Sequence, residues 1–190
     1  MSIILTSLPT LMFGQSTKEE IEESIKQEEM PEGAISAISE FWENLSTGAY
    51  YRETGGEMVT YEAKLDWQGY QYSIEFNESG RLLDIEQLVG FEELPKSIRD
   101  SVLTYLESEY TKHEITRVQR QFLANEKDED NEDVIEDVLE RDFEDLLILY
   151  ELEVDAQNKK VLGSFELLFD DDGELVQKRR IVRRSLDNIW

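Results

Sequence analysis

Apolar residues at every second position mark two hairpins in this chain. Such a period puts one side-chain face of a strand into a core and leaves the other face in water. Each pair of alternating segments is followed by a polar turn that ends in a glycine, Gly80 or Gly173. We therefore expect two antiparallel hairpins of similar construction. The alternating segments are 61–67, 70–76, 150–154 and 165–169.

An acidic pair followed by a proline predicts two amphipathic helices. Residues 28–31 read Glu-Glu-Met-Pro and residues 92–95 read Glu-Glu-Leu-Pro. Proline suits the start of a helix, where a backbone N–H has no partner within the helix. Apolar residues three or four positions apart then form one face. The predicted buried stripes are Ile35, Ile38, Phe41 (or Trp42) and Leu45 in the first helix, and Ile98, Val102, Tyr105 and Leu106 in the second.

The order of helix, strand, hairpin and strand occurs twice along the chain. A strand is expected at 49–53 or 114–123 after each helix, and another begins near Leu83 or Val176 after each glycine turn. This order predicts an α+β fold of two tandem repeats, each a helix packed on an antiparallel β-sheet. We place the first repeat at residues 16–93 and the second at residues 94–190.

The second repeat contains an acidic insertion at about residues 124–145. Part of it has the period of a helix, through Val134, Ile135, Val138 and Leu139. Residues 125–133 have almost nothing apolar to bury, so we expect them to form a mobile loop. A solvated acidic segment is the simpler interpretation, and diffuse binding of cations or of a basic partner is the alternative.

The repeated order resembles the PepSY-like family with the β-lactamase-inhibitor-protein-like (BLIP-like) fold. The resemblance implies a small secreted or periplasmic protein in which a helical segment packs on one face of an antiparallel sheet. It implies no enzymatic activity, and some relatives by fold bind and block enzymes with the concave face of the sheet. The residues that carry it are Pro31, Tyr61, Glu62, Phe76 and Gly80, then Pro95, Tyr150, Glu151, Phe169, Asp170, Asp172 and Gly173.

The first 15 residues are apolar and contain no lysine or arginine. They are too few to span a bilayer as a helix. They look like the end of a secretory signal without its basic start, which a misassigned start codon would explain. A short apolar strand or tail is the alternative. We favour the signal and expect a periplasmic or secreted protein.

Charge limits the classes of partner. The chain has 44 acidic and 19 basic residues and a formal net charge of -25, which repels nucleic acids and anionic membranes. Cations, basic proteins and neutral surfaces remain, although acidity also simply favours solubility. The basic run at 178–184 either lies beside acidic strands of its own sheet or forms a docking patch. No cysteine is present, which excludes disulfides and thiolate metal sites.

The turn at residues 170–174 is the candidate metal site. Asp170, Asp172 and Glu174 could offer oxygen ligands to Ca²⁺. The spacing of an EF-hand is absent, and Asp is also favoured in such turns because its side chain bonds its own backbone. The first hairpin makes a comparable turn with Asn77 and fewer charges.

Catalytic motifs are absent from the sequence. His113 is the only histidine, and the chain has neither a nucleophile turn nor a glycine-rich phosphate loop. Carboxylates are too abundant for any pair to indicate acid–base catalysis. We expect neither an enzyme nor a bound cofactor.

Aromatic residues are the candidate partner-binding groups. Trp67, Tyr70 and Tyr72 lie in the first hairpin, where Trp67 is either an exposed anchor or a cap on the core. Tyr51 adjoins Tyr50 in one strand, so the two rings must face opposite sides. We expect an exported protein-binding or inhibitory module that acts through its sheet face. The alternative is a divalent-cation-responsive protein that uses the Asp170 turn and the acidic insertion.

Overall fold

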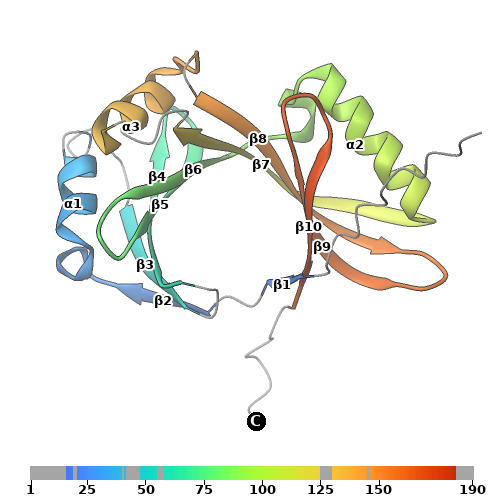
Figure 1. Ribbon diagram of the computed structural model, residues 1–190, viewed down its shortest axis with the longest axis horizontal. Helices are drawn as coiled ribbons and strands as arrows, with labels where there is room; N and C mark the ends of the chain where they lie inside the picture. The colour runs from blue at the N-terminus through green and yellow to red at the C-terminus, as the bar shows by residue number, and fades with distance from the viewer. Residues whose placement is uncertain are drawn as a thin grey trace, which may run out of the picture.

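The computed structural model describes residues 16–18, 21–39, 41, 48–54, 58–124, 130–144 and 146–182 (Figure 1). The strands are β1 (Ser16–Lys18), β2 (Ile21–Ile25), β3 (Gly48–Thr54), β4 (Thr60–Trp67), β5 (Tyr70–Asn77), β6 (Leu82–Leu88), β7 (Lys112–Ala124), β8 (Leu146–Gln157), β9 (Leu162–Phe169) and β10 (Leu175–Ile181). The helices are η1 (Gln27–Glu29), α1 (Glu32–Ser39), η3 (Phe91–Glu93), α2 (Lys96–Glu109) and α3 (Asn131–Glu140), where η denotes a 3-10 helix. None of these helices is long and apolar enough to cross a membrane.

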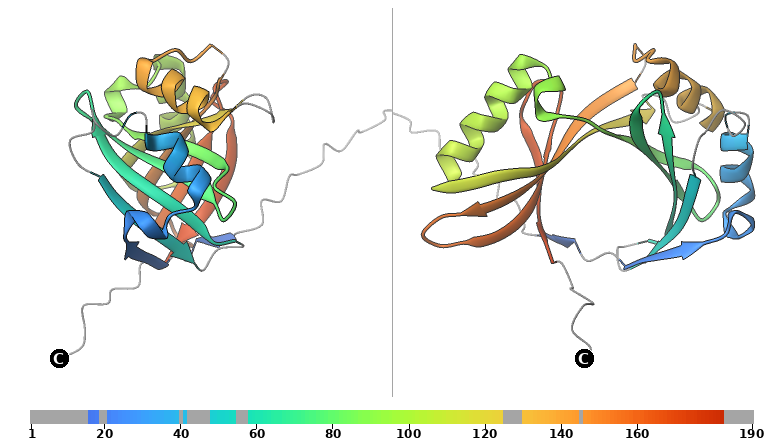
Figure 2. Two further views of the ribbon diagram at one scale, coloured as in Figure 1. Left: turned by 90° about the vertical axis from the view of Figure 1, so that its left-hand side faces the viewer. Right: turned by 180° about the vertical axis from the view of Figure 1, so that it is seen from behind.

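One curved sheet contains all ten strands, in the order β1-β10-β9-β8-β7-β6-β5-β4-β3-β2. Neighbours run antiparallel except β1, which pairs parallel with β10. The strands at the two ends of this order are separated in sequence only by residues 19–20. Such a link spans about 10 Å at most, so it holds the two edges of the sheet close together. Figures 1 and 2 show the resulting curl, with α1, α2 and α3 on its outer face.

The two predicted hairpins are β4–β5 and β8–β9. In both, the alternating apolar residues face the helices and the alternate polar residues face the opposite, inner side of the sheet. The strands expected at 49–53 and 114–123 lie within β3 and β7. The local alternation thus predicted these strands correctly.

Both prolines directly precede helices, as predicted. The carbonyl of Pro31 accepts a hydrogen bond from Ile35 N at 3.1 Å, and that of Pro95 accepts one from Arg99 N at 3.0 Å. The second glutamate of the acidic pair before each helix caps a 3-10 turn. Glu29 Oε2 accepts from Lys26 N at 2.9 Å and caps the 3-10 turn η1.

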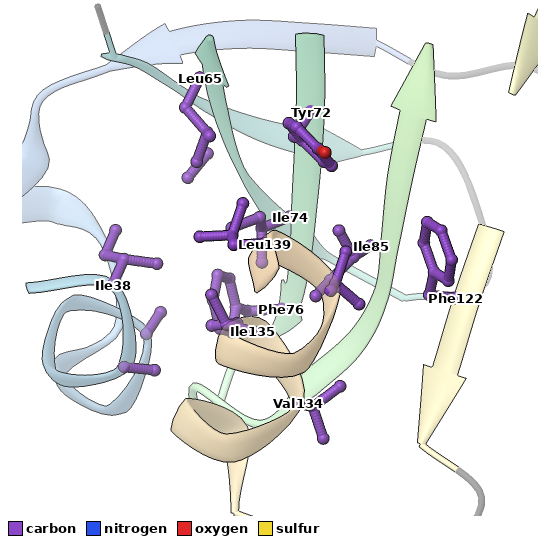
Figure 3. Close-up of a cluster of buried hydrophobic side chains, with 14 of the residues drawn as sticks. Ile38, Leu65, Tyr72, Ile74, Phe76, Ile85, Phe122, Val134, Ile135 and Leu139 are labelled. Carbon is purple, nitrogen blue, oxygen red and sulfur yellow. The ribbon is translucent and has the colours of Figure 1, made fainter. Parts of the chain in front are cut away.

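The two cores lie between the helices and the outer face of the sheet. The first core packs α1 and α3 on β3–β7 and the start of β8 (Figure 3). Its fully buried residues of largest volume are Phe76, Phe122, Ile38, Ile74, Ile85 and Ile135. The second core packs α2 on β7–β10, and its counterparts are Phe165, Phe169, Ile98, Leu106, Leu152 and Leu167.

The predicted stripe of the second helix is confirmed, with Ile98, Val102 and Leu106 buried and Tyr105 half-buried. The stripe of the first helix is partly wrong. Helix α1 ends at Ser39 and buries Ala34, Ala37 and Ile38. Ile35 and Phe41 pack at the edge of this core. Trp42 and Leu45 lie outside the described residues.

The acidic insertion is a structural element, and the expectation of a solvated segment is wrong for its helix. Helix α3 buries the predicted face through Val134, Ile135, Val138 and Leu139. Residues 131–133 belong to this helix and not to a loop. The side-chain amide of Asn131 donates to Gly80 O at 2.7 Å, and its Oδ1 accepts from Leu82 N at 2.9 Å. Residues 125–129 lie outside the described residues.

Candidate functional site

The three aromatic residues of the first hairpin lie on the helix-covered face. Tyr72 is only 3% exposed and accepts a hydrogen bond from Gln87 Nε2 at 2.8 Å. Trp67 Nε1 donates to Leu139 O of α3 at 3.2 Å, and Tyr70 Oη donates to Glu93 Oε2 at 2.8 Å. Of the two alternatives for Trp67, the structure shows the one in which it covers the core. These rings join the sheet to its helices and do not form a free sheet surface.

Tyr51 faces the inner side of the sheet, where it lies half-buried with Lys64 Nζ 4.5 Å from the centre of its ring. Its neighbour Tyr50 is 7% exposed and belongs to the first core. The prediction that these two rings face opposite sides is confirmed. Tyr51 alone among the predicted aromatic residues therefore lies on the face that the described helices leave open.

The inner face of the sheet is polar, and part of it is buried. Strand alternation places polar side chains there opposite the two cores. The buried members are Thr60, Glu62, Ser73, Gln119, Glu151 and Glu166. Because the sheet curls toward this side, side chains from neighbouring strands crowd together. Sequence alternation identifies these positions as outward-facing, but only the curl shows that water is partly excluded from them.

A groove of about 240 Å³ opens on this inner face across β3–β7. Gln119 Nε2 donates to Glu86 Oε2 at 2.5 Å in its wall. The groove combines cationic, anionic and amide groups, so it can bind the charged side chains and the backbone of a peptide. Its lining residues are Gly48, Ala49, Lys64, Leu65, Asp66, Gln71, Tyr72, Ser73, Glu86, Leu88, Arg117 and Gln119.

Beside the groove, oxygens of Glu22, Glu53 and Glu62 lie within 4.8 Å of one another. Among the described residues, these three form the one such group that could hold a metal ion. Lys64 already contacts this group, through ion pairs with Glu22 and with Glu62 Oε2. Burial lowers the pKa of Lys64, but its hydrogen bonds to these two carboxylates outweigh burial and raise it. A charged lysine therefore already offsets part of the negative charge.

The predicted calcium site at residues 170–174 is arranged as a turn. Asp170 Oδ1 accepts from Glu174 N at 2.7 Å, and Gly173 has a φ of 82°. Asn77 makes the corresponding turn in the first hairpin, accepting from Arg81 N at 3.1 Å. The carboxylates of Asp170, Asp172 and Glu174 do not form a group as compact as the one beside the groove. Turn chemistry explains the Asp at the start of this motif.

The basic C-terminal strand uses its charges within the fold. Arg179 Nε donates to Glu166 Oε1 at 2.5 Å, and its Nη2 lies 3.9 Å from Glu151 Oε2. Lys178 Nζ lies 5.0 Å from the ring centre of Tyr110 in the second core. The interpretation that this run lies beside acidic strands of its own sheet is confirmed for Arg179. Residues 183–184 lie outside the described residues.

Comparisons with known proteins identify the fold. No protein-family model matches the chain, and no relative is found among curated proteins. A DUF2874 family protein from Bacteroides ovatus matches with a TM-score of 0.52 at 12% identity, covering 80% of this chain and 87% of that one. A protein from Bacteroides eggerthii, whose name suggests that it is periplasmic, matches with the same TM-score and identity and covers 80% and 88%.

A BLIP-like protein from Bacteroides fragilis also matches, with a TM-score of 0.49 at 15% identity, covering 85% and 92% of the two chains. At 12% identity, the two matches with a TM-score of 0.52 show the fold alone. The predicted α+β class, with helices packed on an antiparallel sheet, is therefore confirmed.

Proposed function

We propose that this protein is a non-enzymatic protein-binding module that acts through the inner face of its sheet. The observation that carries the proposal is the one-sided placement of α1, α2 and α3, which leaves the groove side of the sheet open (Figures 1 and 2). A sheet covered on one face has a rigid surface on the other. Such a surface binds a partner with little loss of conformational entropy.

The composition of the groove supports a peptide or loop as the occupant. Lys64 and Arg117 can bind carboxylates, Asp66 and Glu86 can bind cations, and Gln71 can both donate to and accept from a backbone amide. Mixed polar walls of this kind bind extended protein segments through hydrogen bonds. Inhibition of a partner enzyme is the specific form of binding that we favour.

We propose a periplasmic or secreted location. The apolar first 15 residues and the fold shared with a protein from Bacteroides eggerthii whose name suggests a periplasmic location support it. Absence of cysteine fits either an oxidising or a reducing compartment.

We also propose that the chain arose by duplication of one helix-and-sheet unit, with copies at 16–93 and 94–190. Three paired features support this origin. Pro31 and Pro95 both precede helices, carboxylates cap the 3-10 turns before both prolines, and both hairpins end in a glycine with positive φ. Binding through the groove, which crosses from β3 to β7, would then depend on strands from both copies.

Capture from a periplasmic extract tests the function. The variant Gln71→Ala/Arg117→Ala removes two groove side chains without disturbing either core. We expect it to lose a protein that the wild type captures. The matched control is Leu103→Ala/Glu107→Ala, on the exposed side of α2, which should capture that protein as the wild type does. Equal capture by both variants would contradict binding through the inner face.

A further inference from the structure

Carboxylates face one another across neighbouring strands on the inner face. Glu22 is the register partner of Glu53, and Glu75 is the register partner of both Glu62 and Asp84. Like charges directly opposite one another in a sheet repel and reduce its stability. We call Glu22, Glu53, Glu62, Glu75, Asp84 and Glu86 the acidic face. A fold that keeps such pairs is stabilised by any cationic group that binds over them.

Cations are scarce near the acidic face. On the inner side of β2–β6, Lys64 is the one basic residue among those that the structure describes, and it forms ion pairs with Glu22 and Glu62. Arg117 on β7 is a second cation in the lining of the groove. Asp66 adds a further carboxylate to the same side of β4. Negative charge therefore exceeds positive charge over this part of the sheet. The potential there favours a positively charged partner.

Glu62 shows how far the acidic face depends on its one basic neighbour. Its side chain is nine-tenths buried and points into the acidic face, and its Oε1 accepts from Ser73 Oγ. Lys64 Nζ lies 2.9 Å from its Oε2 and also pairs with Glu22, so one positive charge is shared between two carboxylates. An ammonium or guanidinium group from outside would add the positive charge that these carboxylates lack.

The groove beside the acidic face fits an extended chain better than a single ion. It crosses β3 to β7, and strands lie about 4.8 Å apart, so its length is about 19 Å, enough for roughly six extended residues. Gln71, one of its lining residues, can bond a backbone that crosses the strands. Cationic side chains of that segment would reach the adjacent row of Glu62, Glu75 and Asp84.

We propose that the inner face binds an extended, lysine- or arginine-rich segment of a partner protein, with the segment lying across β3–β7 and its cations on the acidic face. This inference rests on the proposed function and specifies the chemistry of the partner. The acidic face selects the charge of the segment, and the groove selects an extended backbone.

A fluorescently labelled octapeptide of alternating lysine and serine is the probe, and anisotropy at 150 mM salt is the measurement. We expect saturable binding to the wild type, and none with a peptide of alternating glutamate and serine. The variant Glu75→Gln/Asp84→Asn keeps the acceptors for Thr60 and Gln121 but removes two charges. It should bind the lysine peptide about tenfold more weakly.

A control variant distinguishes binding at the acidic face from attraction by the overall charge of the protein. A protein with a net charge of -25 attracts any polycation, so Glu107→Gln/Glu109→Gln on α2 removes the same charge far from the inner face. This variant should bind the peptide as the wild type does. If both variants weaken binding equally, attraction is nonspecific and the inference is wrong. Circular dichroism melts of each variant establish that both are folded.

Calcium without the peptide tests whether the acidic face is instead a metal site. If 2 mM CaCl₂ raised the melting temperature of the wild type but not of Glu75→Gln/Asp84→Asn, and the lysine peptide did not bind, the acidic face would be a metal site and the inference would be overturned. The proposed function has a separate test. A captured protein that is lost with Gln71→Ala/Arg117→Ala but carries no basic segment would leave that function standing and remove this inference.

Discussion

The two regions of the sheet are covered by different numbers of helices: α1 and α3 cover the first core, and α2 alone covers the second. Helix α2 has 14 residues and α1 has 8, so at 1.5 Å per residue they are about 21 Å and 12 Å long. The longer helix places Ile98, Val102 and Leu106 on the second core without help from another helix. The shorter helix cannot cover the larger first core, and α3 covers the remainder (Figure 3).

Helix α3 comes from the later part of the sequence but covers the first core. This helix lies between β7 and β8 in sequence, yet its four buried residues belong to the first core. Its N-terminal Asn131 bonds the backbone at Gly80 and Leu82, at the turn between β5 and β6. The first core is therefore complete only when α3, which follows β7 in sequence, packs on it. Short helices in such a fold require cover from elsewhere in the chain.

The two glycine turns approach different kinds of atom in their helices. A Cβ at Gly80 would lie 2.8 Å from Ala34 N and 2.9 Å from Gly33 Cα, so α1 approaches the turn backbone to backbone. A Cβ at Gly173 would lie 2.5 Å from Ser101 Oγ, a side-chain atom of α2. The small residues of α1 permit a closer approach than α2 makes. The first region is thus less able to adjust.

The largest expected effect comes from truncating the helix that completes the first core. Ile135→Ala removes a side chain that is 0% exposed and should cost about 2–5 kcal/mol of unfolding free energy, measured by urea denaturation. Leu106→Ala is the matched variant in α2, also 0% exposed. Hydrogen exchange should rise mainly in β4–β6 for Ile135→Ala and mainly in β8–β10 for Leu106→Ala. The same exchange pattern in both variants would contradict two separate cores.

A smaller effect is expected from the glycine turns. Left-handed backbone alone costs a non-glycine residue about 1–2 kcal/mol, and both glycines have φ near 80°. Gly80→Ala should lose more than this, because the backbone of α1 cannot retreat. Gly173→Ala should lose less unfolding free energy than Gly80→Ala, because the neighbouring Ser101 is a side chain that can move. Thermal and urea unfolding of the two variants provide the comparison.

A double variant tests the reason for that difference. Ser101→Gly removes the two atoms that a Cβ at residue 173 would overlap, at a helix cost of about 0.5 kcal/mol. Gly173→Ala/Ser101→Gly should therefore be less destabilised than the sum of its single changes. Strict additivity would show that the backbone conformation, and not the contact with α2, makes glycine necessary at residue 173.

Much of the fold was predictable because its signals are local. Alternation specifies the strands of both hairpins, and a proline after an acidic pair specifies where α1 and α2 begin. The destination of α3 was not predictable in this way. Val134, Ile135, Val138 and Leu139 show that the helix has a buried face, but a period does not identify the surface that it meets. Its position in the second predicted repeat did not indicate that it packs on the first core.

The candidate site was harder to predict than the fold. Trp67, Tyr70 and Tyr72 share their period with buried residues such as Leu65, so their place in the core was readable from the sequence. The acidic face was not readable, because it depends on register. Glu75 faces both Glu62 and Asp84 only through the pairing of three strands, with a shift between Glu75 and Phe76. Curvature of the sheet, which buries Glu62, has no local signal.

The smallest expected effect is the pH dependence of stability that comes from one buried tyrosine in each core. Burial raises the pKa of Tyr50 in the first core and of Tyr110 in the second to about 12, from an ordinary value of 10. Since the folded state holds these protons more tightly than the unfolded state, the stability that they contribute is complete below pH 10 and is lost as the pH rises toward 12. Urea midpoints should therefore fall over this range.

Phenylalanine variants separate the two contributions. Tyr110 Oη is buried and makes no hydrogen bond of good geometry within the described residues, so Tyr110→Phe should change stability at pH 8 by less than about 1 kcal/mol. Tyr110→Phe and Tyr50→Phe should each reduce the fall in urea midpoint between pH 10 and 12, because each removes one group that must ionise. If Tyr50→Phe reduced it and Tyr110→Phe did not, the second core would admit water where the first excludes it, and the comparison would have to be reversed: the region with one long helix would be the looser of the two.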